Sequence, residues 1–407
     1  MTRTPHALDD VAGLALGSGH PGRPRRPRRG PRTGLIAAVA GAGLLLAGGG
    51  WAATTLGGSD APRGAASGAA TASASAAPSP AAATPTPSPT PTGPIVGGWY
   101  AGASGLGVAE GTFAAWLRQP VTIAGTWADQ DARAQTQLTP LSSEYKAWKG
   151  ALDIAVAGTV LGSGENYRAA ARGAYDARWR AAAKTLAARR GKATAPTFAR
   201  PFHEMNGFWY RNWQVTKANV TDYKAAHARY VKILRTAMPT VLISWSPNFR
   251  DHSGMPIEQW YPGDAVVDCI APDYYNDVAT HWTVAAWNAA ADDVDPLGNP
   301  LGPEAWRQFA LKHGKPLCFP ETGLKPSGGG TDHPQWIAAF NAWLNLHANP
   351  TRWHLGEPIP AEAAGTVLYS IYFNVPHEGQ NGFTIHGRGA NPKSEKVFRS
   401  LTWGRKP

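Results

Sequence analysis

The segment Arg200-Pro-Phe-His-Glu-Met-Asn-Gly-Phe-Trp-Tyr210 places three ionisable side chains directly before an Asn-Gly turn and a run of aromatic residues. Residues 194–199 read Thr-Ala-Pro-Thr-Phe-Ala and predict a strand that enters this turn. Arg200, His203 and Glu204 would be costly to bury without partners. Their position at a strand end is compatible with a structural ion pair, but it also indicates a reactive site.

Aromatic residues follow Glu204 closely. Trp209, Tyr210 and Trp213 lie within nine residues of it. Exposed rings beside a carboxylate suit a sugar, which offers apolar C–H faces and hydroxyl edges. We therefore predict that these three rings line a carbohydrate-binding cleft. The alternative is that they are core residues.

Strand-like and helix-like segments alternate on both sides of this segment. The strand predictions cover residues 95–101, 121–126, 152–158, 194–199, 241–246, 266–272, 316–319 and 367–373. The helix predictions cover residues 109–119, 165–190, 220–238, a part of 284–313, 335–346 and 394–401. This alternation predicts an α/β fold, a (β/α)8 TIM barrel. A doubly wound open sheet is the alternative, although no Gly-rich nucleotide loop follows the first strand.

Chemistry in such a barrel gathers at the C-terminal ends of the strands. Two carboxylates, Glu204 and Glu321, follow strands four and seven, and we expect them to face each other across the barrel mouth. A lone Glu321 could instead cap a turn. Further candidates at strand ends are Trp245, Asn248, Asp273, Tyr275 and Asn374.

At this point the chain resembles glycoside hydrolase family 26, most of whose characterised members are endo-β-1,4-mannanases. The resemblance spans roughly residues 95–400. It rests on the segment 200–207 and on four further motifs, which are Trp245-Ser-Pro-Asn248, Trp260-Tyr-Pro-Gly-Asp264, Val267-Asp268 through Asp273-Tyr-Tyr275, and Tyr372-Phe-Asn374.

The resemblance implies a (β/α)8 fold and hydrolysis with retention of configuration. It implies that Glu204 is the general acid/base and Glu321 the nucleophile. It also implies that His203 contacts the sugar and that Tyr275 hydrogen-bonds the nucleophile. Where the family usually has an Asp-Trp pair, this chain has Gly382-Phe383. The substrate therefore stays open between β-mannan, mixed-linkage β-glucan and β-1,3-xylan.

The residues support the same chemistry without the family. A retaining glycosidase needs one ionised carboxyl that attacks the anomeric carbon and one protonated carboxyl that releases the leaving oxygen. Arg200 and Tyr275 could hold Glu321 anionic by charge and hydrogen bonding. Trp209 and the negative charge of Glu321 should raise the pKa of Glu204. Asp273 and Asn374 are expected to support these groups. A non-catalytic carbohydrate-binding barrel is the less favoured alternative.

The sequence of residues 1–93 predicts that the protein is exported. Residues 1–33 carry seven Arg and two Asp, and no charged residue lies between positions 34 and 56. That arrangement fits a basic cytoplasmic segment followed by a transmembrane anchor or signal peptide at 34–56. An Ala/Ser/Pro/Thr-rich linker covers 57–93, and the catalytic domain is expected at 94–407. We expect an extracellular protein, secreted or tethered to the cell membrane.

Charge and histidine spacing limit the partners. The net charge is +11, but nearly half of it lies in residues 1–33, so nucleic-acid binding is not expected. The histidines show no metal-ligand spacing, and neither a metal nor another cofactor is expected. The predicted partners are a polysaccharide and, through an uncleaved anchor, a membrane. We expect a monomer.

The chain has two cysteines, Cys269 and Cys318, on neighbouring predicted strands. Export favours a disulfide between them. Strand alternation argues against it, because Cys269 shares a face with Tyr275 while Cys318 lies on the face opposite to Glu321. We therefore predict two buried free thiols.

Overall fold

The computed structural model describes residues 94–95, 97–129, 131–276, 283–325, 332–376 and 382–404. The predicted N-terminal segments 1–33, 34–56 and 57–93 lie outside the described residues. Within the described ranges, no helix combines the length and apolar character needed to cross a bilayer.

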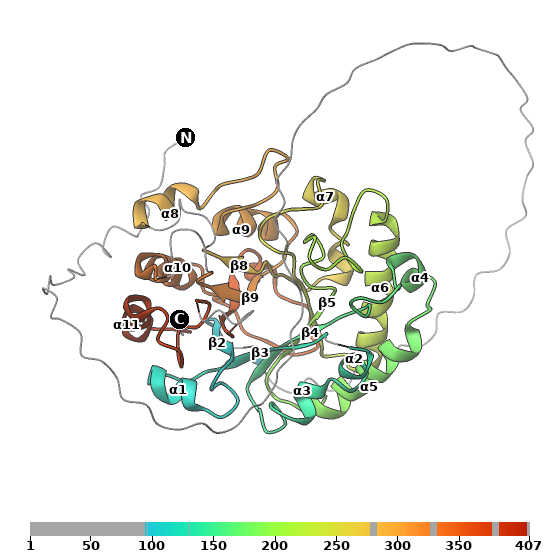
Figure 1. The fold of residues 1–407 in the computed structure, drawn as a ribbon, viewed down its shortest axis with the longest axis horizontal. Coiled ribbons are helices and arrows are strands. Elements are labelled where there is room, and N and C mark those ends of the chain that lie inside the picture. Colours follow the sequence, from blue (N-terminus) through green and yellow to red (C-terminus); the bar gives the residue numbers. More distant parts are fainter. Residues whose placement is uncertain are drawn as a thin grey trace, which may run out of the picture. The chain divides into compact units, whose positions relative to one another are not determined.

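The described residues contain a closed barrel of eight parallel strands, as predicted (Figure 1). Neighbours pair in sequence order, and the last strand closes the barrel by pairing with both the first and the seventh. The sixth strand is interrupted and consists of two short pieces, β7 and β8. The strands are β2 (Tyr100–Gly105), β3 (Ile123–Ala128), β4 (Ala151–Val156), β5 (Thr197–Pro201), β6 (Leu242–Trp245), β7 (Cys269–Ile270) with β8 (Tyr274–Tyr275), β9 (Leu317–Gly323) and β11 (Val367–Asn374).

Helices surround the strands in the ribbon (Figure 1). Their bounds are α1 (Thr112–Leu117), α2 (Ala132–Gln137), α3 (Thr139–Ser142), α4 (Tyr167–Ala171), α5 (Asp176–Arg190), α6 (Val220–Ala237), α7 (Ile257–Trp260), α8 (Val284–Ala290), α9 (Pro303–Lys312), α10 (Pro334–Leu346) and α11 (Pro392–Ser400). A separate antiparallel pair joins β1 (Pro94–Ile95) to β10 (Trp353–His354).

Helix α6 shows why these segments become the outer layer. Its buried side chains recur every three or four residues, at Tyr223, Ala226, Tyr230, Val231 and Leu234. That spacing makes one apolar stripe that faces the barrel. The ring of Tyr230 stacks on Trp179 of α5 at 4.4 Å between centroids, and this contact fixes the two helices against each other.

A second apolar cluster fills the barrel interior below the strand ends. It combines side chains from seven barrel strands and from the β1–β10 pair, with Phe198 and Tyr369 in ring contact at 4.6 Å. Because side chains alternate along a strand, the residues on the other face pack against the helices. The barrel is thus a packed core whose C-terminal mouth is left for polar groups.

Three sequence-based boundaries needed correction. The first barrel strand begins at Tyr100, because residues 94–95 pair with β10 instead. The predicted helix 165–190 is two helices, separated at Gly173, which adopts φ +90°. That backbone conformation is one that L side chains rarely adopt, so the φ angle favours glycine at this position. The region 284–313 is likewise two helices, α8 and α9.

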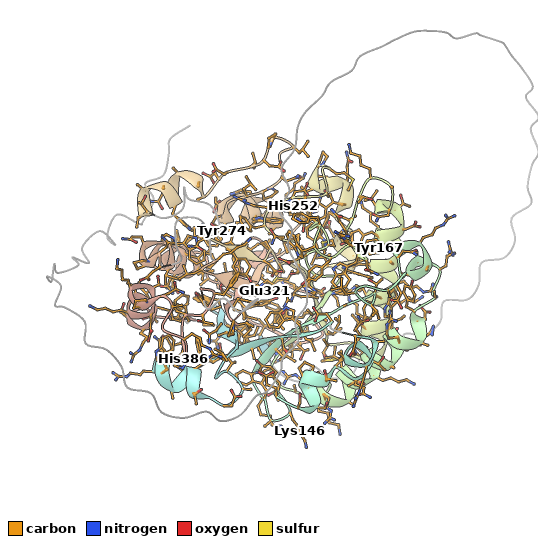
Figure 2. All side chains as sticks on the ribbon, viewed as in Figure 1. Lys146, Tyr167, His252, Tyr274, Glu321 and His386 are labelled. Carbon is orange, nitrogen blue, oxygen red and sulfur yellow. A yellow bond between two sulfur atoms is a disulfide. The ribbon has the colours of Figure 1, made fainter. Side chains whose placement is uncertain are left out.

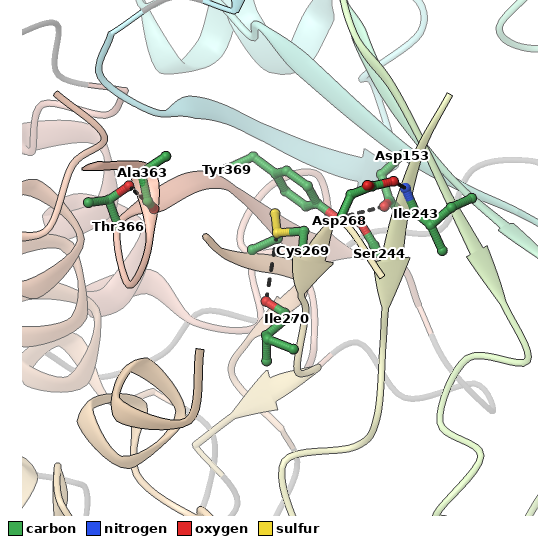
Figure 3. Close-up of a disulfide and its surroundings, with 10 residues drawn as sticks. Asp153, Ile243, Ser244, Asp268, Cys269, Ile270, Ala363, Thr366 and Tyr369 are labelled. Atoms are coloured by element: carbon green, nitrogen blue, oxygen red, sulfur yellow. Dashed lines mark hydrogen bonds between the residues drawn. A yellow bond between two sulfur atoms is a disulfide. The ribbon is translucent and has the colours of Figure 1, made fainter. Parts of the chain in front are cut away.

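The prediction of two free thiols was wrong, because Cys269 and Cys318 form a disulfide. Their Cα atoms are 6.2 Å apart, within the ordinary range for such a bridge. Strands β7 and β9 pair directly, and both cysteines belong to the interior cluster that also holds Tyr369. Figure 3 labels Cys269 and Tyr369 in this region.

An irregularity in β9 explains the error. Between Phe319 and Thr322 this strand advances three residues while β11 advances two. The Phe319 ring packs outward against Phe340 of α10 at 5.2 Å, whereas Glu321, two residues later, points into the barrel. The bulge reverses the alternation, so Cys318 shares the interior face with Glu321.

Candidate active site

Three hydrogen-bond donors converge on the Glu321 carboxylate. Arg200 Nη1 donates to Oε1 at 2.9 Å and Trp127 Nε1 donates to the same oxygen at 2.7 Å. The Tyr275 hydroxyl donates to Oε2 at 3.0 Å. The expected partners Arg200 and Tyr275 therefore do contact this carboxylate. An ionised carboxylate is an acceptor only, and this arrangement supplies it with three donors.

Arg200 is completely buried and connects several carboxylates. Its Nε donates to Asp153 Oδ1 at 2.5 Å, and its Nη1 lies 3.6 Å from Asp273 Oδ1. Burial alone would lower the pKa of Arg200, but Asp153, Asp273 and Glu321 together raise it well above its ordinary value. The guanidinium is thus a fixed positive charge beneath the mouth.

The two aspartates beside Arg200 have further partners. Asp153 Oδ2 accepts from the Tyr369 hydroxyl at 2.7 Å, which positions the carboxylate from below. Asp273 accepts from the Ser246 hydroxyl at 3.3 Å. Burial and the negative charge of Glu321 raise the pKa of Asp273 well above its usual range.

Glu204 has a different environment. Asn248 Nδ2 donates to its Oε1 and Trp209 Nε1 to its Oε2, both at 2.7 Å. Burial first, and the charge of Glu321 second, raise the pKa of Glu204 to about 7, against the lowering effect of those two donors. The rise and the contribution of Glu321 agree with the prediction, but Trp209 lowers the pKa through its hydrogen bond and does not raise it. Glu204 is therefore partly protonated near neutral pH.

The backbone before Glu204 is locally strained. Phe202 and Glu204 adopt φ angles of 55° and 47°, in the left-handed region that non-glycine residues rarely occupy. The Glu204 amide donates to the Ser246 carbonyl at 2.6 Å, and Trp213 Nε1 donates to the His203 carbonyl at 2.9 Å. Such strain persists only where surrounding contacts fix it, and it clusters at reactive sites.

His203 lies below the loop as a neutral base. Its Nε2 is 3.0 Å from the Tyr210 hydroxyl and 3.5 Å from Asp129 Oδ2. Burial and the charge of Arg200 lower the pKa of His203 well below its usual value. Burial is also the main reason why the pKa of Asp129 rises to about 6.

Aromatic side chains enclose the two glutamates. On the Glu321 side, the Phe373 ring lies edge-on to Trp127 at 5.4 Å, and Phe383 lies edge-on to Tyr275 at 5.9 Å. Trp209 and Tyr210 are partly exposed near Glu204. Figure 2 shows the labelled Glu321 near the centre of the fold. The mouth is therefore ring-lined on both sides, with polar groups between.

Two tryptophans predicted to bind substrate do not reach the mouth. Trp213 and Trp245 have no exposed surface. Trp213 stacks under Tyr210 at 4.5 Å, while Trp245 points outward and donates from Nε1 to the Tyr223 hydroxyl at 2.9 Å. For Trp213 the core alternative is therefore correct, and Trp245 is a core residue as well.

Asn374 is a positioning residue, as its strand-end location suggested. Its Nδ2 donates to the Leu106 carbonyl, and its Oδ1 accepts from the amides of Ile385 and His386. These bonds connect the loops that follow β2 and β11. Because the second loop carries Phe383, Asn374 holds one wall of the site.

Trp127, Asp129 and Asp153 contribute to the site but were not predicted from the sequence. Trp127 lies at the C-terminal end of β3 and Asp129 directly follows that strand, where the same reasoning that found Glu321 would have indicated them. Asp153 is the one charged residue within β4, which is otherwise apolar and wholly buried. A charge in such a strand is itself a signal of a buried partner.

Comparison with known sequences finds one family match. The profile described as glycosyl hydrolase family 26 matches residues 171–291, which include Glu204, Asn248, Asp273 and Tyr275. The resemblance expected from the sequence is thereby confirmed over that segment. No curated protein sequence matches the chain.

Solved structures show the fold. A modular endo-β-1,4-mannanase from Cellulomonas fimi aligns with a TM-score of 0.51 and 18% identity, covering 75% of this chain and 71% of that one. A family 26 β-mannanase from Bacteroides ovatus aligns with a TM-score of 0.42 and 15% identity, covering 70% and 86%. At 18% identity, the likeness to the Cellulomonas fimi enzyme shows the barrel architecture alone.

Proposed function

We propose that this protein is a retaining endo-glycoside hydrolase of family 26 that cleaves β-1,4-mannosidic bonds in mannan-type polysaccharides. The observation that carries the proposal is the contrast between two glutamates at one barrel mouth. Glu321 accepts three hydrogen bonds, one of them from a buried guanidinium, whereas burial raises the pKa of Glu204 to about 7. Opposed environments of this kind assign a nucleophile and an acid.

The reaction proceeds in two displacements. In the first, a Glu321 oxygen forms a bond to the anomeric carbon while the bond to the glycosidic oxygen breaks, and the Glu204 proton passes to that oxygen. In the second, Glu204 takes a proton from water, the water oxygen forms a bond to the anomeric carbon, and Glu321 is released. Tyr275 and Arg200 hold Glu321 in place for both attack and release.

Support for mannan comes from the matched family profile and from the resemblance of the motifs to a family dominated by mannanases. Mixed-linkage β-glucan and β-1,3-xylan are the alternatives. The deciding experiment incubates the purified domain with mannan, galactomannan, β-glucan and β-1,3-xylan and measures new reducing ends. Release from mannan alone supports the proposal, and release from another glycan alone changes the substrate.

Stereochemistry tests the mechanism separately. NMR of the first product from a β-linked oligosaccharide should show the β-anomer before mutarotation, because two inversions restore the configuration. An initial α-anomer would contradict the assignment of Glu321 as nucleophile. A protein that binds mannan without cleaving it would support the non-catalytic alternative.

We also propose that the protein is exported and acts as a monomer. The basic segment and the apolar span before the linker support export, and so does the Cys269–Cys318 disulfide, because such bonds persist in oxidising compartments. Fractionation of producing cells, followed by immunodetection with and without reducing agent, tests the location.

A further inference from the structure

We propose that Phe208 and His252, together with Trp209, form a platform that binds the sugar on the leaving-group side of the scissile bond. This inference rests on the proposed function and identifies a binding surface of the same site. The ligand is a neutral pyranose ring that presents an apolar C–H face.

The first observation is the exposure of Phe208. Half of its surface (50%) is accessible. Among the described residues, the other large exposed apolar side chains are all aliphatic, at Val294, Leu297, Leu311 and Leu346. Phe208 contacts Trp209, whose indole donates to Glu204. A phenyl ring kept half in water at this place is poorly explained by packing, and it provides an apolar face for a ligand.

The second observation is that the ring is held in place. Phe208 meets Trp209 edge-on at 5.2 Å and His252 edge-on at 5.3 Å, and Trp209 meets His252 at 5.4 Å. Each ring thus contacts the other two at the distances that aromatic pairs prefer. A platform fixed before the ligand arrives loses little conformational entropy on binding.

Gly207 makes this arrangement possible. A Cβ at this position would lie 2.4 Å from the indole carbons of Trp209. The φ of Gly207 is not in the left-handed region, so the requirement for glycine is steric. The chain therefore passes directly against the indole, and any larger residue would displace the ring trio.

The third observation is the side of the site on which the trio lies. Trp209 Nε1 donates to Glu204 Oε2, and Asn248, four residues before His252, donates to Glu204 Oε1. The rings around Glu321 are different ones, Trp127 and Tyr275.

The proposed mechanism then indicates which sugar the platform contacts. Glu321 attacks the ring that stays with the enzyme, whereas Glu204 protonates the oxygen that departs with the neighbouring ring. A platform attached to Glu204 therefore lies beside the departing sugar. The expected consequence is a preference for substrates that extend past the cleavage point.

The test compares two leaving groups on one glycone. One substrate is a β-1,4-manno-oligosaccharide, whose leaving group is a sugar chain. The other is a β-mannobiosyl fluoride, whose leaving fluoride contacts no platform. For Phe208→Ala we expect kcat/KM on the oligosaccharide to fall about tenfold, as for loss of an aromatic anchor. The fluoride should be hydrolysed at the wild-type rate within about twofold.

Control variants distinguish the loss of a sugar contact from structural damage to the site. Phe208→Trp should restore activity on the oligosaccharide, and Leu346→Ala, which removes an equally exposed side chain on α10, should change neither substrate. Equal losses on both substrates would show that Phe208 acts through Glu204 and would overturn the platform. Unchanged activity on both would overturn it as well.

Binding provides a readout that does not need turnover. Quenching of tryptophan fluorescence by manno-oligosaccharides should weaken in Phe208→Ala and His252→Ala. If Phe208→Ala binds and cleaves the oligosaccharide as well as the wild-type protein does, the platform is overturned but the proposed function is not. A wild-type protein that neither binds nor cleaves any manno-oligosaccharide overturns the proposed function together with the platform.

Discussion

Arg200 on β5 and Glu321 on β9 are joined by a hydrogen bond of 2.9 Å that crosses the barrel interior. The guanidinium has no exposed surface and also holds Asp153 and Asp273. One buried cation therefore organises the strands that carry both glutamates, since Arg200 lies four residues before Glu204. Arg200 therefore contributes both to the arrangement of the strands and to the position of the Glu321 carboxylate.

Removal of this cation should destabilise the protein severely. Arg200→Met leaves three buried carboxyls without their counter-charge, and breaking a buried pair in this way costs about 3–5 kcal/mol. Urea denaturation measures the loss. The control is Lys312→Met, which breaks the exposed pair with Glu258 and should cost about 0–1 kcal/mol. Equal effects of both variants would contradict the structural role of Arg200.

Each catalytic glutamate should be indispensable without being needed for folding. Glu204→Gln should lower kcat by about 10²–10⁴-fold, the range for loss of a general acid. Glu321→Gln should lower it by about 10⁴-fold or more, because no covalent intermediate can form. Initial rates on the preferred glycan and circular dichroism of both variants provide the check.

Azide rescue should separate the two roles. In Glu204→Ala, azide should attack the glycosyl-enzyme intermediate and give a β-azide. In Glu321→Ala, azide should replace the nucleophile and give an α-azide. The same anomer from both variants would refute the assignment of roles.

The pH profile should report on Glu204. Because this group acts as an acid, kcat should fall as pH rises through its pKa of about 7. Asn248 donates to the carboxylate form and lowers the pKa of Glu204, so Asn248→Ala should move the basic limb to higher pH. The measurement is kcat between pH 4 and 10 for both proteins. A basic limb that stays in place, or moves to lower pH, would argue against Glu204 as the acid.

Substitution of two tryptophans near Glu204 should have different effects, on activity in one case and on stability in the other. Trp209→Phe removes the donor that orients the Glu204 carboxyl and should lower kcat/KM about tenfold, with little change in melting temperature. Trp213→Phe removes a buried indole and its bond to the His203 carbonyl, and should cost about 1–3 kcal/mol of stability. Melting curves and kinetics for both variants distinguish a contact with Glu204 from a role in core packing.

Much of this arrangement could be predicted from local patterns. The alternation of strand-like and helix-like segments predicted the eight-stranded barrel, and strand ends predicted that Glu204, Glu321, Asn248 and Tyr275 meet at one mouth. These predictions depend only on the rule that parallel strands end on the same side. Contacts between those side chains then followed from charge and hydrogen-bonding capacity.

Residues whose role depends on packing were harder to predict. Trp213 and Trp245 were expected at the mouth because they lie near Glu204 and at a strand end. Which way an indole points depends on backbone conformation, including the positive φ values at Phe202 and Glu204, which no pattern in the sequence specifies. Phe208, one residue before Trp209, is by contrast exposed.

The last prediction concerns the disulfide, where period-two reasoning failed at the bulge in β9. Cys269 and Cys318 enclose a long chain segment, with a sequence separation of 49 residues. Crosslinking a segment of that length restricts the unfolded chain and typically stabilises by about 2–4 kcal/mol. Cys269→Ala/Cys318→Ala should therefore lower the free energy of unfolding by that amount.

Activity should separate this effect from the chemistry. Neither cysteine contacts Glu204 or Glu321, so kcat well below the melting temperature should stay within about twofold of wild type. Thiol titration of the denatured, unreduced protein should find no reactive thiol, and titration after reduction should find two. Two thiols before reduction would show that the bridge does not form in the protein as produced.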